Sequence, residues 1–309
     1  MTIQMRPYTD EDLPRLQDTL AEWIQHAGAC GYYHPGNIAH RIYEGFSGRI
    51  PRHDLVHLWE EAGDIVGFTY SFVFDAAFFA FVAPRYRGST LELELLRTAI
   101  TTTERYMAET KQDEQSDFPS VITDVYNCDQ VRIDLLTQLG FEHYRTWDWI
   151  TERSLAEPVP EPVLPAGFTV RTATRDDAEQ LAAIRNNAFG GSWSGTVYHN
   201  QVMCSPGYDP ARELIVIAPD GRIAAFTVIR FDDVNLVGLL EPVGTHSEFR
   251  RLGLARAMML YALQAMQHHG LARAIVEHTA DNAPACELYR SIGFHKQYET
   301  WGFQRPSIV

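Results

Sequence analysis

Cysteine is scarce in this sequence, and the few cysteines lie far apart. Four occur in 309 residues, at Cys30, Cys128, Cys204 and Cys286. None has the close spacing of a zinc site or of a redox Cys-x-x-Cys motif. We therefore expect reduced, mostly buried thiols, as is typical of a cytoplasmic protein. The twelve histidines include no His-Glu-x-x-His or similar pair of ligands, so we expect no metal.

Positive charge is also in short supply. The chain has 26 Lys and Arg against 40 Asp and Glu, and its net charge is −14. Nucleic-acid binding is not expected, because phosphate backbones require a basic protein face. A solvated acidic surface is the simplest interpretation of this charge, and affinity for a cationic or amine substrate is the alternative.

Long apolar runs are missing as well. No stretch approaches the roughly 18 residues needed to span a bilayer, so no membrane partner is expected. The first residues, MTIQMRPYTDEDLPRL, are polar from the start and do not resemble a signal peptide. We therefore expect a cytoplasmic protein. Its 309 residues suffice for two domains that each have their own core.

Proline is concentrated in one segment near the middle of the chain. Residues 157–165, EPVPEPVLP, contain four prolines in nine positions. This density disfavours helices and central strands and favours a stiff, extended connector. The sequence thus predicts a linker at residues 156–166 between domains of residues 1–155 and 167–309.

The two predicted domains resemble each other. Residues 3–12, IQMRPYTDED, match residues 168–177, FTVRTATRDD, and both predict a short strand, a turn and an aspartate-capped helix. Both domains end in a strand, a short helix and a Gly-Phe pair. Strands that alternate with helices in each copy predict an α/β (α+β) fold, with a mixed central sheet flanked by helices. We interpret the chain as a duplicated module.

One stretch of the second domain, residues 243–265, combines a strand end, a loop and a helix. The helix is predicted by apolar residues that recur at helical spacing, among them Ala255, Met258 and Ala262. Unpaired backbone N–H groups at the start of such a helix, together with the helix dipole, suit a phosphate or pyrophosphate. Arg250 and Arg251 add permanent positive charge beside them.

Two motifs of the second domain resemble the GNAT superfamily of acyl-CoA-dependent N-acyltransferases. The loop signature Arg/Gln-x-x-Gly-x-Gly/Ala is met by Arg250, Gly253 and Ala255. A later signature, Asn-x-x-Ala-x-x-Leu-Tyr…Gly-Phe, is met by Asn282, Ala285, Leu288, Tyr289, Gly293 and Phe294. The resemblance covers the second domain fully and the first in outline. Two tandem GNAT-like domains with the active copy second resemble the architecture of the mycothiol synthases.

The resemblance implies acetyl-CoA as co-substrate and assigns residues to its parts. The pyrophosphate would lie on backbone amides of Leu252, Gly253, Leu254, Ala255 and Arg256, beside Arg250 and Arg251. The pantetheine arm would run along the strand edge of Val243, Gly244 and Thr245, where this strand separates from the next, and Asn282 would bind the arm. Small residues at positions 253 and 255 leave room for the phosphates to approach the backbone.

The resemblance also implies a proton donor, Tyr289, directed at the thioester sulfur. Tyrosine, with a reference pKa of about 10, can protonate the departing thiolate. The alternative role of Tyr289 is that of a buried aromatic in the core.

An amine acceptor also needs a general base. Strand alternation predicts that Leu239, Glu241, Val243 and Thr245 share one face, which makes Glu241 the charged residue nearest the acyl group. A water held by Glu241 could serve instead, and His246 and His278 are competing candidates for the base. Glu241 could also be a salt-bridged surface carboxylate.

The first domain lacks these features. Thr90 and Glu92 occupy the positions of Gly253 and Ala255, and Leu136 that of Tyr289. A carboxylate ~4 Å from a pyrophosphate charge costs roughly 4 kcal/mol at an effective dielectric of ~20. We therefore expect residues 1–155 to form a degenerate GNAT-like domain that binds no coenzyme A, and residues 167–309 to form the catalytic domain.

The expected activity is acetyl transfer from acetyl-CoA to a primary amine of a small molecule or peptide, directly within a ternary complex. Trp193 and Tyr198 are candidate acceptor contacts in the loop of residues 190–199, unless they serve in packing. A non-catalytic coenzyme A-binding regulatory protein and a mycothiol-synthase-like acetyltransferase are the alternatives. The sequence leaves the acceptor, the acyl chain and the oligomeric state open.

Overall fold

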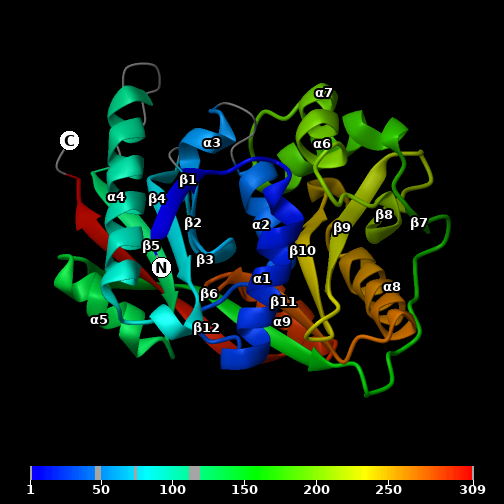
Figure 1. Cartoon of the computed structure of the whole chain (residues 1–309). Coiled ribbons are helices and arrows are strands. Elements are labelled where there is room, and N and C mark those ends of the chain that lie inside the picture. The colour runs from blue at the N-terminus through cyan, green and yellow to red at the C-terminus, as the bar shows by residue number, and fades with distance from the viewer. Residues whose placement is uncertain (1, 46–49, 73–74, 111–118, 308–309) are drawn as a thin grey trace. The chain divides into compact units, whose positions relative to one another are not determined.

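The structure is a computed structural model that describes residues 2–45, 50–72, 75–110 and 119–307. The chain forms two compact units (Figure 1). The first consists of Met1–Trp149 and Tyr298–Val309, and the second of Ile150–Gln297.

The unit boundaries differ from the cut expected from the sequence near residue 155. The second unit begins at Ile150, inside strand β6 (Glu142–Ser154), and ends at Gln297, inside strand β12 (His295–Pro306). The last part of the chain therefore belongs to the first unit. Residues 156–166 contain neither helix nor strand, which their proline content explains.

The first unit is built around an open sheet. Its strands follow the order β1-β2-β3-β4-β5-β12, and neighbouring strands are antiparallel except for β4 and β5, which are parallel. Its elements before β6 are β1 (Ile3–Pro7), α1 (Asp12–Ala27), α2 (Pro35–Ala39) with a π-helical continuation (His40–Glu44), α3 (Arg52–Leu55), β2 (Val56–Glu61), β3 (Asp64–Phe72), β4 (Ala77–Val82), α4 (Thr90–Thr110), β5 (Ser120–Tyr126) and α5 (Gln130–Gln138).

The second unit repeats this plan. Its strands follow the order β6-β11-β10-β9-β8-β7, with a parallel β10–β11 pair and antiparallel pairs from β10 to β7. Its further elements are β7 (Thr169–Thr172), α6 (Ala178–Phe189), α7 (Gly195–Tyr198) with a π-helical continuation (His199–Met203), β8 (Glu213–Ile217), β9 (Ile223–Asp232), β10 (Val237–Thr245), α8 (Leu254–His269), β11 (Arg273–Thr279) and α9 (Ala283–Ser291).

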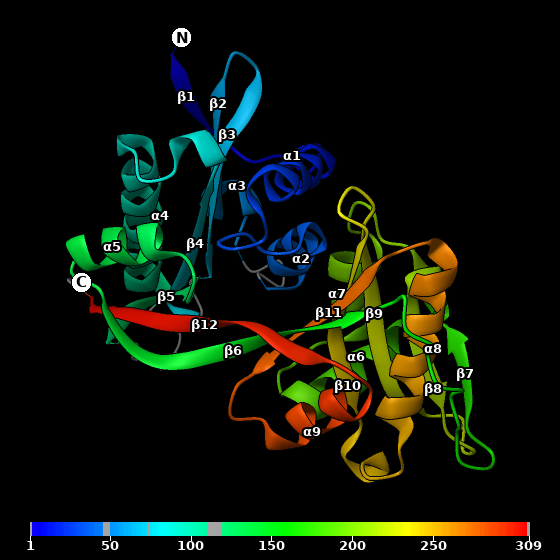
Figure 2. The same ribbon diagram turned by 90° about the horizontal axis from the view of Figure 1, so that it is seen from below.

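Helices cover both faces of the second unit's sheet. Successive strand residues point to opposite faces, so Ile215 and Phe226 pack with α6 and α7, whereas Val216 and Ala225 pack with Leu254 and Met258 of α8. Figure 2 shows α8 running alongside the strands of this sheet. The predicted α/β class, with a mixed sheet flanked by helices in each copy, is confirmed.

The duplication extends to individual side chains. In each copy an arginine of the first strand binds an aspartate at the start of the first helix region, Arg6 to Asp12 at 2.6 Å and Arg171 to Asp177 at 2.7 Å. Each aspartate also accepts a hydrogen bond from the backbone amide three residues before it, at 2.9 Å and 2.7 Å respectively. The matched segments predicted from the sequence therefore fold alike.

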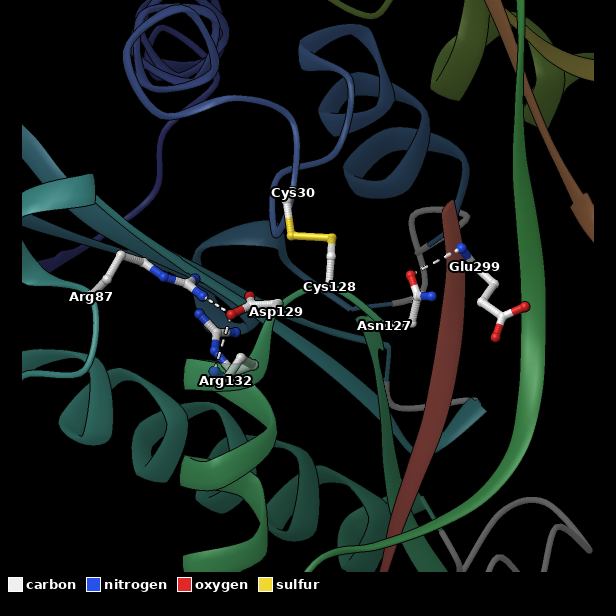
Figure 3. The surroundings of a disulfide bond; sticks show 7 residues. All are labelled: Cys30, Arg87, Asn127, Cys128, Asp129, Arg132 and Glu299. Carbon is white, nitrogen blue, oxygen red and sulfur yellow. Dashed lines mark hydrogen bonds and ion pairs between the residues drawn. A yellow bond between two sulfur atoms is a disulfide. The ribbon is translucent and has the colours of Figure 1, made fainter. Parts of the chain in front are cut away.

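The expectation of reduced, mostly buried cysteines is wrong. Cys30 and Cys128 form a disulfide whose Cα atoms are 6.1 Å apart (Figure 3). Cys204 is a free, exposed cysteine. Cys30 follows α1 and Cys128 precedes α5, so 98 residues separate two positions that the fold brings together. Disulfides are uncommon in cytoplasmic proteins, and the expected cytoplasmic location remains a prediction. In the described ranges, no helix has the length and apolar character required to cross a bilayer.

Candidate functional site

Strands β10 and β11 lie side by side at one end and separate along their length. Val237 to Leu239 pair with Arg273 to Ile275. Over the residues that the structure describes they pair no further, although β10 continues to Thr245. The predicted separation of these strands is therefore confirmed. It leaves one edge of β10 with backbone groups that an extended ligand arm can meet as an added strand would.

A β-bulge lies at the point where the strands separate. Leu240 pairs with Ile229 and Val243 with Thr227, so β10 has one more residue than β9 between these two pairs. Pro242 lies in the bulge and has no N–H group to contribute to a ladder. A bulge of this kind bends its strand and increases the local twist.

This bulge corrects the prediction of a shared strand face. Simple alternation placed Leu239, Glu241, Val243 and Thr245 together, but the extra residue changes the register within the strand. Leu240 and Val243 instead face the same side and pack into the core that contains Tyr289. Glu241 belongs to the bulge itself and is partly exposed. The position of Glu241 is therefore determined by the bulge, and simple strand alternation does not predict it.

The loop before α8 has an unusual backbone. Arg251 (φ 68°) and Gly253 (φ 79°) are both in the left-handed region, which glycine adopts without strain. Gly253 is the N-cap residue of α8 and has no side chain that could cap the helix. Within the described ranges, none of the backbone amides of residues 252–256 donates a hydrogen bond to the protein. The start of α8 thus presents a set of N–H groups suited to an anion.

The space and charge around this helix start also suit an anion. A Cβ atom built on Gly253 would meet no atom within 4 Å beyond its neighbours in the chain, so the space beside Gly253 is open. Arg250 and Arg251 are exposed, and Arg256 in the first helical turn is partly exposed. The residues of the predicted pyrophosphate loop lie together at the start of α8. The remaining members are Leu252, Leu254 and Ala255. Arg250 Nε also approaches the carbonyl oxygen of Thr245 at 3.4 Å.

Asn282 is the N-cap residue of α9. Its Oδ1 atom accepts a hydrogen bond from the Ala285 amide at 3.2 Å, which fixes the orientation of the side chain. The Nδ2 group is then left as a donor for a carbonyl group of a ligand. This geometry is compatible with the predicted contact between Asn282 and the pantetheine arm.

Tyr289 lies two turns further along α9 and is only 6% exposed. Burial raises the pKa of its hydroxyl, and the charges of Glu241 and then Cys286 raise this pKa further. The hydroxyl is therefore protonated throughout the physiological range and can donate a hydrogen bond. Because a raised pKa also weakens an acid, proton transfer from Tyr289 requires negative charge to build up on its acceptor first.

The candidate bases differ in their surroundings. Glu241 is close enough to Tyr289 for its charge to affect the tyrosine pKa. His278 is buried, its ring centroid is 4.9 Å from that of Tyr289, and burial lowers its pKa, so its imidazole is neutral. His246 lies in the turn after β10, where its Nδ1 atom accepts a hydrogen bond from the Glu248 amide at 3.3 Å. Glu241 and His278 thus accompany Tyr289, whereas His246 caps a turn.

The two candidate acceptor contacts are placed differently. Trp193 is partly exposed, and both polar atoms of the Asn186 side chain hold its backbone, each at 2.8 Å. Tyr198 is 1% exposed, and its hydroxyl donates a hydrogen bond to the buried Glu213. Trp193 can therefore meet a ligand from its loop, whereas the Tyr198 hydroxyl is engaged within the core.

The corresponding loop of the first unit is filled by the protein's own side chains. Glu92 is fully buried, and its carboxylate accepts hydrogen bonds from the Gly88 amide at 2.5 Å and from Arg132 Nε at 2.8 Å. Arg87 lies 3.3 Å from the same carboxylate. Asp129, the N-cap residue of α5, binds Arg87 and the Arg132 amide (Figure 3). In the first unit, a carboxylate of the protein itself therefore lies near the start of α4. The matching start of α8 in the second unit is open.

The first unit lacks the bulge, but its strands β4 and β5 also separate: among the described residues they pair only at Ala77 and Ile122, although β4 continues to Val82. Strand β4 pairs with β3 in unbroken register through Phe78 and Phe79, in the region where β10 has Glu241 and Pro242. Arg132 Nη1 donates a hydrogen bond to the Ala80 carbonyl of β4 at 2.7 Å. A cavity of about 20 Å³ adjoins this region, room for a water molecule rather than a pantetheine arm. Its lining is Gly31, Tyr33, Phe79, Ala80, Phe81, Thr123, Asp124, Val125, Tyr126, Asp129 and Arg132.

Sequence reasoning missed a contact in the second unit. Cys286 Sγ lies 3.8 Å from His278 Nδ1, beside Tyr289. The spacing of Asn282, Cys286 and Tyr289, by four and then three residues, would have placed the thiol on the same side of the helix as the other two residues. Among the described residues, no group of three or more His, Cys, Asp or Glu side chains is arranged to hold a metal ion.

Residues 178–294 match a protein-family model described as the acetyltransferase (GNAT) family. The matched segment contains the loop before α8, Asn282 and Tyr289. It falls within the second unit, and the corresponding part of the first unit is not included in the match.

Curated relatives match part of the chain. The mycothiol acetyltransferase of Nocardia farcinica (strain IFM 10152) is 32% identical over 159 residues, which cover 47% of this chain and 52% of the relative. The mycothiol acetyltransferase of Arthrobacter sp. (strain FB24) is 28% identical over 171 residues, which cover 52% and 53%. The chain thus spans about half the length of the curated relatives it matches.

Solved structures match the whole chain. A tandem GNAT protein from the clavulanic acid biosynthesis pathway has a TM-score of 0.67 at 14% identity, with 100% of this chain and 99% of that chain covered. A GCN5-related N-acetyltransferase from Sphaerobacter thermophilus has a TM-score of 0.62 at 18% identity, with 98% and 95% covered. At these identities the likeness concerns the fold, and it confirms the predicted pair of GNAT-like folds.

Proposed function

We propose that this chain, whose residues 178–294 match the acetyltransferase (GNAT) family model, transfers an acetyl group from acetyl-CoA to a primary amine. The observation that carries the proposal is the start of α8, where five consecutive amides and three arginines surround an open, uncapped helix end within the matched segment. Such a set of groups meets the needs of a pyrophosphate.

The proposed cofactor position follows the matched segment. Residues 252–256 would hold the pyrophosphate through their amides, with Arg250 and Arg251 adding positive charge. The free edge of β10 at Val243, Gly244 and Thr245 would bind the pantetheine arm, and Asn282 would donate its Nδ2 group to that arm. The opening between β10 and β11 supports this assignment, because it provides the unpaired strand edge.

The proposed chemistry is direct transfer within a ternary complex. Glu241, or a water that it holds, removes a proton from the amine, which attacks the thioester carbonyl carbon. Backbone N–H groups near residues 243–245 stabilise the oxyanion that forms. Tyr289 then donates its proton to the coenzyme A thiolate as the carbon–sulfur bond breaks. The protonated state of the Tyr289 hydroxyl supports the last step.

The acceptor is proposed to be a small molecule or peptide with a primary amine. The net charge of −14 favours the approach of cationic amines. Trp193 is the proposed contact in the loop after α6, because its backbone is held and the residue as a whole is partly exposed. A mycothiol-synthase-like activity is a second candidate, favoured by the similarity to mycothiol acetyltransferases, and a cysteinyl glycoside acceptor would test it.

The first unit is proposed to bind no coenzyme A. Its own Glu92 carboxylate and the arginines around it occupy the region of the helix start. A non-catalytic, coenzyme A-binding regulatory protein is the alternative function for the whole chain. The presence of Glu241 and Tyr289 near each other in the second unit weighs against that alternative, since the first unit has neither residue type at the matching positions.

A binding and turnover experiment tests the proposal. Calorimetric titration with acetyl-CoA is expected to give one site per chain, and an amine panel read by thiol release is expected to identify turnover that depends on an amine. Tight binding of acetyl-CoA with no turnover on any amine would favour the regulatory alternative. Absence of binding would contradict both functions.

A further inference from the structure

The small cavity of the first unit, where β4 and β5 separate, has two lining residues that are joined by a hydrogen bond. Tyr33, in the loop before α2, donates its hydroxyl hydrogen to Asp124 Oδ2 of β5. The Tyr33 ring also packs edge-on against Phe79 and Phe81 of β4, with ring centroids 5.8 Å and 5.7 Å apart. These rings leave a cavity of only about 20 Å³ beside the Asp124 carboxylate.

The duplication gives both partners of this hydrogen bond a counterpart in the second unit. Asp124 lies two residues before the end of β5 and five before the N-cap residue of α5. Glu277 lies at the same place relative to β11 and the N-cap residue of α9. Tyr33 directly precedes the N-cap residue of α2, and Trp193 directly precedes that of α7. A carboxylate and an aromatic residue thus recur at matching positions.

Glu277 and Trp193 lie on the same face of the second unit's sheet. Val276 packs into the core that contains Tyr289 and much of α8, so strand alternation directs Glu277 to the opposite face. Trp193 packs against the core on that opposite face, which contains Phe226 and residues of α6 and α7. Glu277 is partly exposed, as Trp193 is. The two residues therefore border the region that corresponds to the first unit's cavity.

The bulge in β10 adds a second carboxylate to this region. Leu239 and Ile275 form the last pair of β10 and β11 in the part of the chain that the structure describes. Two residues further along, the strands contain Glu241 and Glu277, one on each side of the opening. The first unit has the aromatic residue Phe79 in this part of β4. An aromatic wall of the first unit is thus replaced by a carboxylate in the second.

We propose that Glu277 binds a second cationic group of the acceptor, next to the amine whose proton Glu241 receives. The acceptor is then a diamine or another small molecule with two cationic groups, because each carboxylate compensates one positive charge. Arg185 of α6 lies over the Trp193 ring at 4.7 Å, so the second cation belongs to the carboxylate, and the ring supplies an apolar wall. This inference rests on the proposed function, because it requires an amine beside Glu241.

The experiment compares α,ω-diamines, from propyl to hexyl, with the matching monoamines as acceptors of the full chain. The expected result is a higher kcat/KM for a diamine, through a lower KM. In Glu277→Gln this advantage should decrease about tenfold, because a hydrogen bond between two charged groups is lost, and the change should appear in KM rather than in kcat. Glu287→Gln, at an exposed position of α9, is the control and should keep the advantage.

A parent chain that prefers no diamine, or an advantage that persists in Glu277→Gln, would overturn the inference. A second variant tests the same contact with the charge retained. In Glu277→Asp the side chain is one methylene shorter, so the preferred diamine should become longer. An unchanged length preference in this variant would contradict the contact. Urea denaturation of both variants shows whether they are folded.

Two results separate this inference from the alternatives. Asp124→Asn removes the matching carboxylate of the first unit and should leave the diamine advantage intact. Loss of the advantage in this variant alone would assign the second cation to the first unit and contradict the role of Glu277. Acetylation of amines with no preference for diamines removes this inference and leaves the proposed function standing. Absence of acetyl-CoA binding, or of turnover on every amine, removes both.

Discussion

Helices α4 and α8 are matching elements of the two units. They differ in the groups available to neutralise the backbone N–H groups at their N-termini. At α8, the backbone amides of residues 252–256 donate no hydrogen bond within the part of the chain that the structure describes, and Ala255 stands where α4 has Glu92. At α4, the buried Glu92 accepts from the Gly88 amide and pairs with Arg132. One copy therefore presents open helix-start amides that suit an anion, and the other contains its own carboxylate.

The same contrast appears at the N-caps of α9 and α5. Asn282 and Asp129 each accept a hydrogen bond from the backbone amide three residues later, at 3.2 Å and 3.1 Å. The asparagine has a donor left for a ligand, whereas the aspartate is bound to Arg87. A single change from amide to carboxylate thus keeps the helix cap and alters what the cap can bind.

The largest expected effect comes from transferring the carboxylate of the first unit into the second. Ala255→Glu would place a charge near the proposed pyrophosphate, and at ~4 Å with a dielectric of ~20 the repulsion is roughly 4 kcal/mol. Affinity for acetyl-CoA should fall about a thousandfold. Calorimetry measures this, with Ala255→Gln as the neutral control of similar size. Equal losses in both variants would mean that bulk rather than charge excludes the ligand.

The next effect concerns the stability of the first unit. Glu92→Gln removes the charge that compensates Arg87 and Arg132 in a buried network. The free energy of unfolding should decrease by about 3 kcal/mol, because breaking a buried ion pair leaves the partner charges uncompensated. Urea denaturation measures this change. Acetyl-CoA affinity in a folded preparation should stay the same, and a loss of affinity would argue for a cofactor site in the first unit.

Tyr289→Phe should lower kcat about a hundredfold and leave acetyl-CoA affinity almost unchanged. The hydroxyl acts on the leaving thiolate, whereas the ring packs in the core and is retained. Because its pKa is raised, ionisation of Tyr289 should cause no loss of rate below pH ~10. Tyr261→Phe on α8 is the control. Undiminished turnover in the Tyr289 variant would remove the proton-donor assignment.

The smallest effect tests the framework that both units share. Arg171 lowers the pKa of Asp177 to about 2, so its stabilising contribution is complete above the unfolded pKa of about 3.8 and is lost as the pH falls toward 2. Asp177→Asn should cost about 1.5 kcal/mol at pH 7, and Asp12→Asn should cost a similar amount. Denaturant curves at pH 7 and at low pH measure both. A cost in only one copy would mean that the framework is not equivalent.

The loop and N-cap of the candidate site could be predicted from sequence because a ligand restricts residue type at fixed spacings. Gly253 and Asn282 can be recognised in the sequence as restrictions of this kind. In the structure Gly253 has a positive φ, and the Asn282 side chain caps α9. The ion network of the first unit could be predicted only in part. Glu92 could be recognised as out of place, but its burial between Arg87 and Arg132 depends on segments about 40 residues apart.

Other features depend on pairing that no local pattern encodes. The bulge at Glu241 and Pro242 arises from the register between β10 and β9, so simple alternation assigned the wrong face to Leu239. The Cys30–Cys128 bond joins two turns of the folded first unit. The C-terminal strand β12 pairs with β5, more than 170 residues earlier, and this pairing places the end of the chain in the first unit.

The number of coenzyme A molecules bound per chain tests the difference between the two helix starts most directly. Calorimetric titration of the full chain is predicted to give one site, abolished by Ala255→Glu and preserved in Glu92→Gln. Two sites in the parent chain, or one site that survives Ala255→Glu, would contradict the assignment of the cofactor to the start of α8 alone.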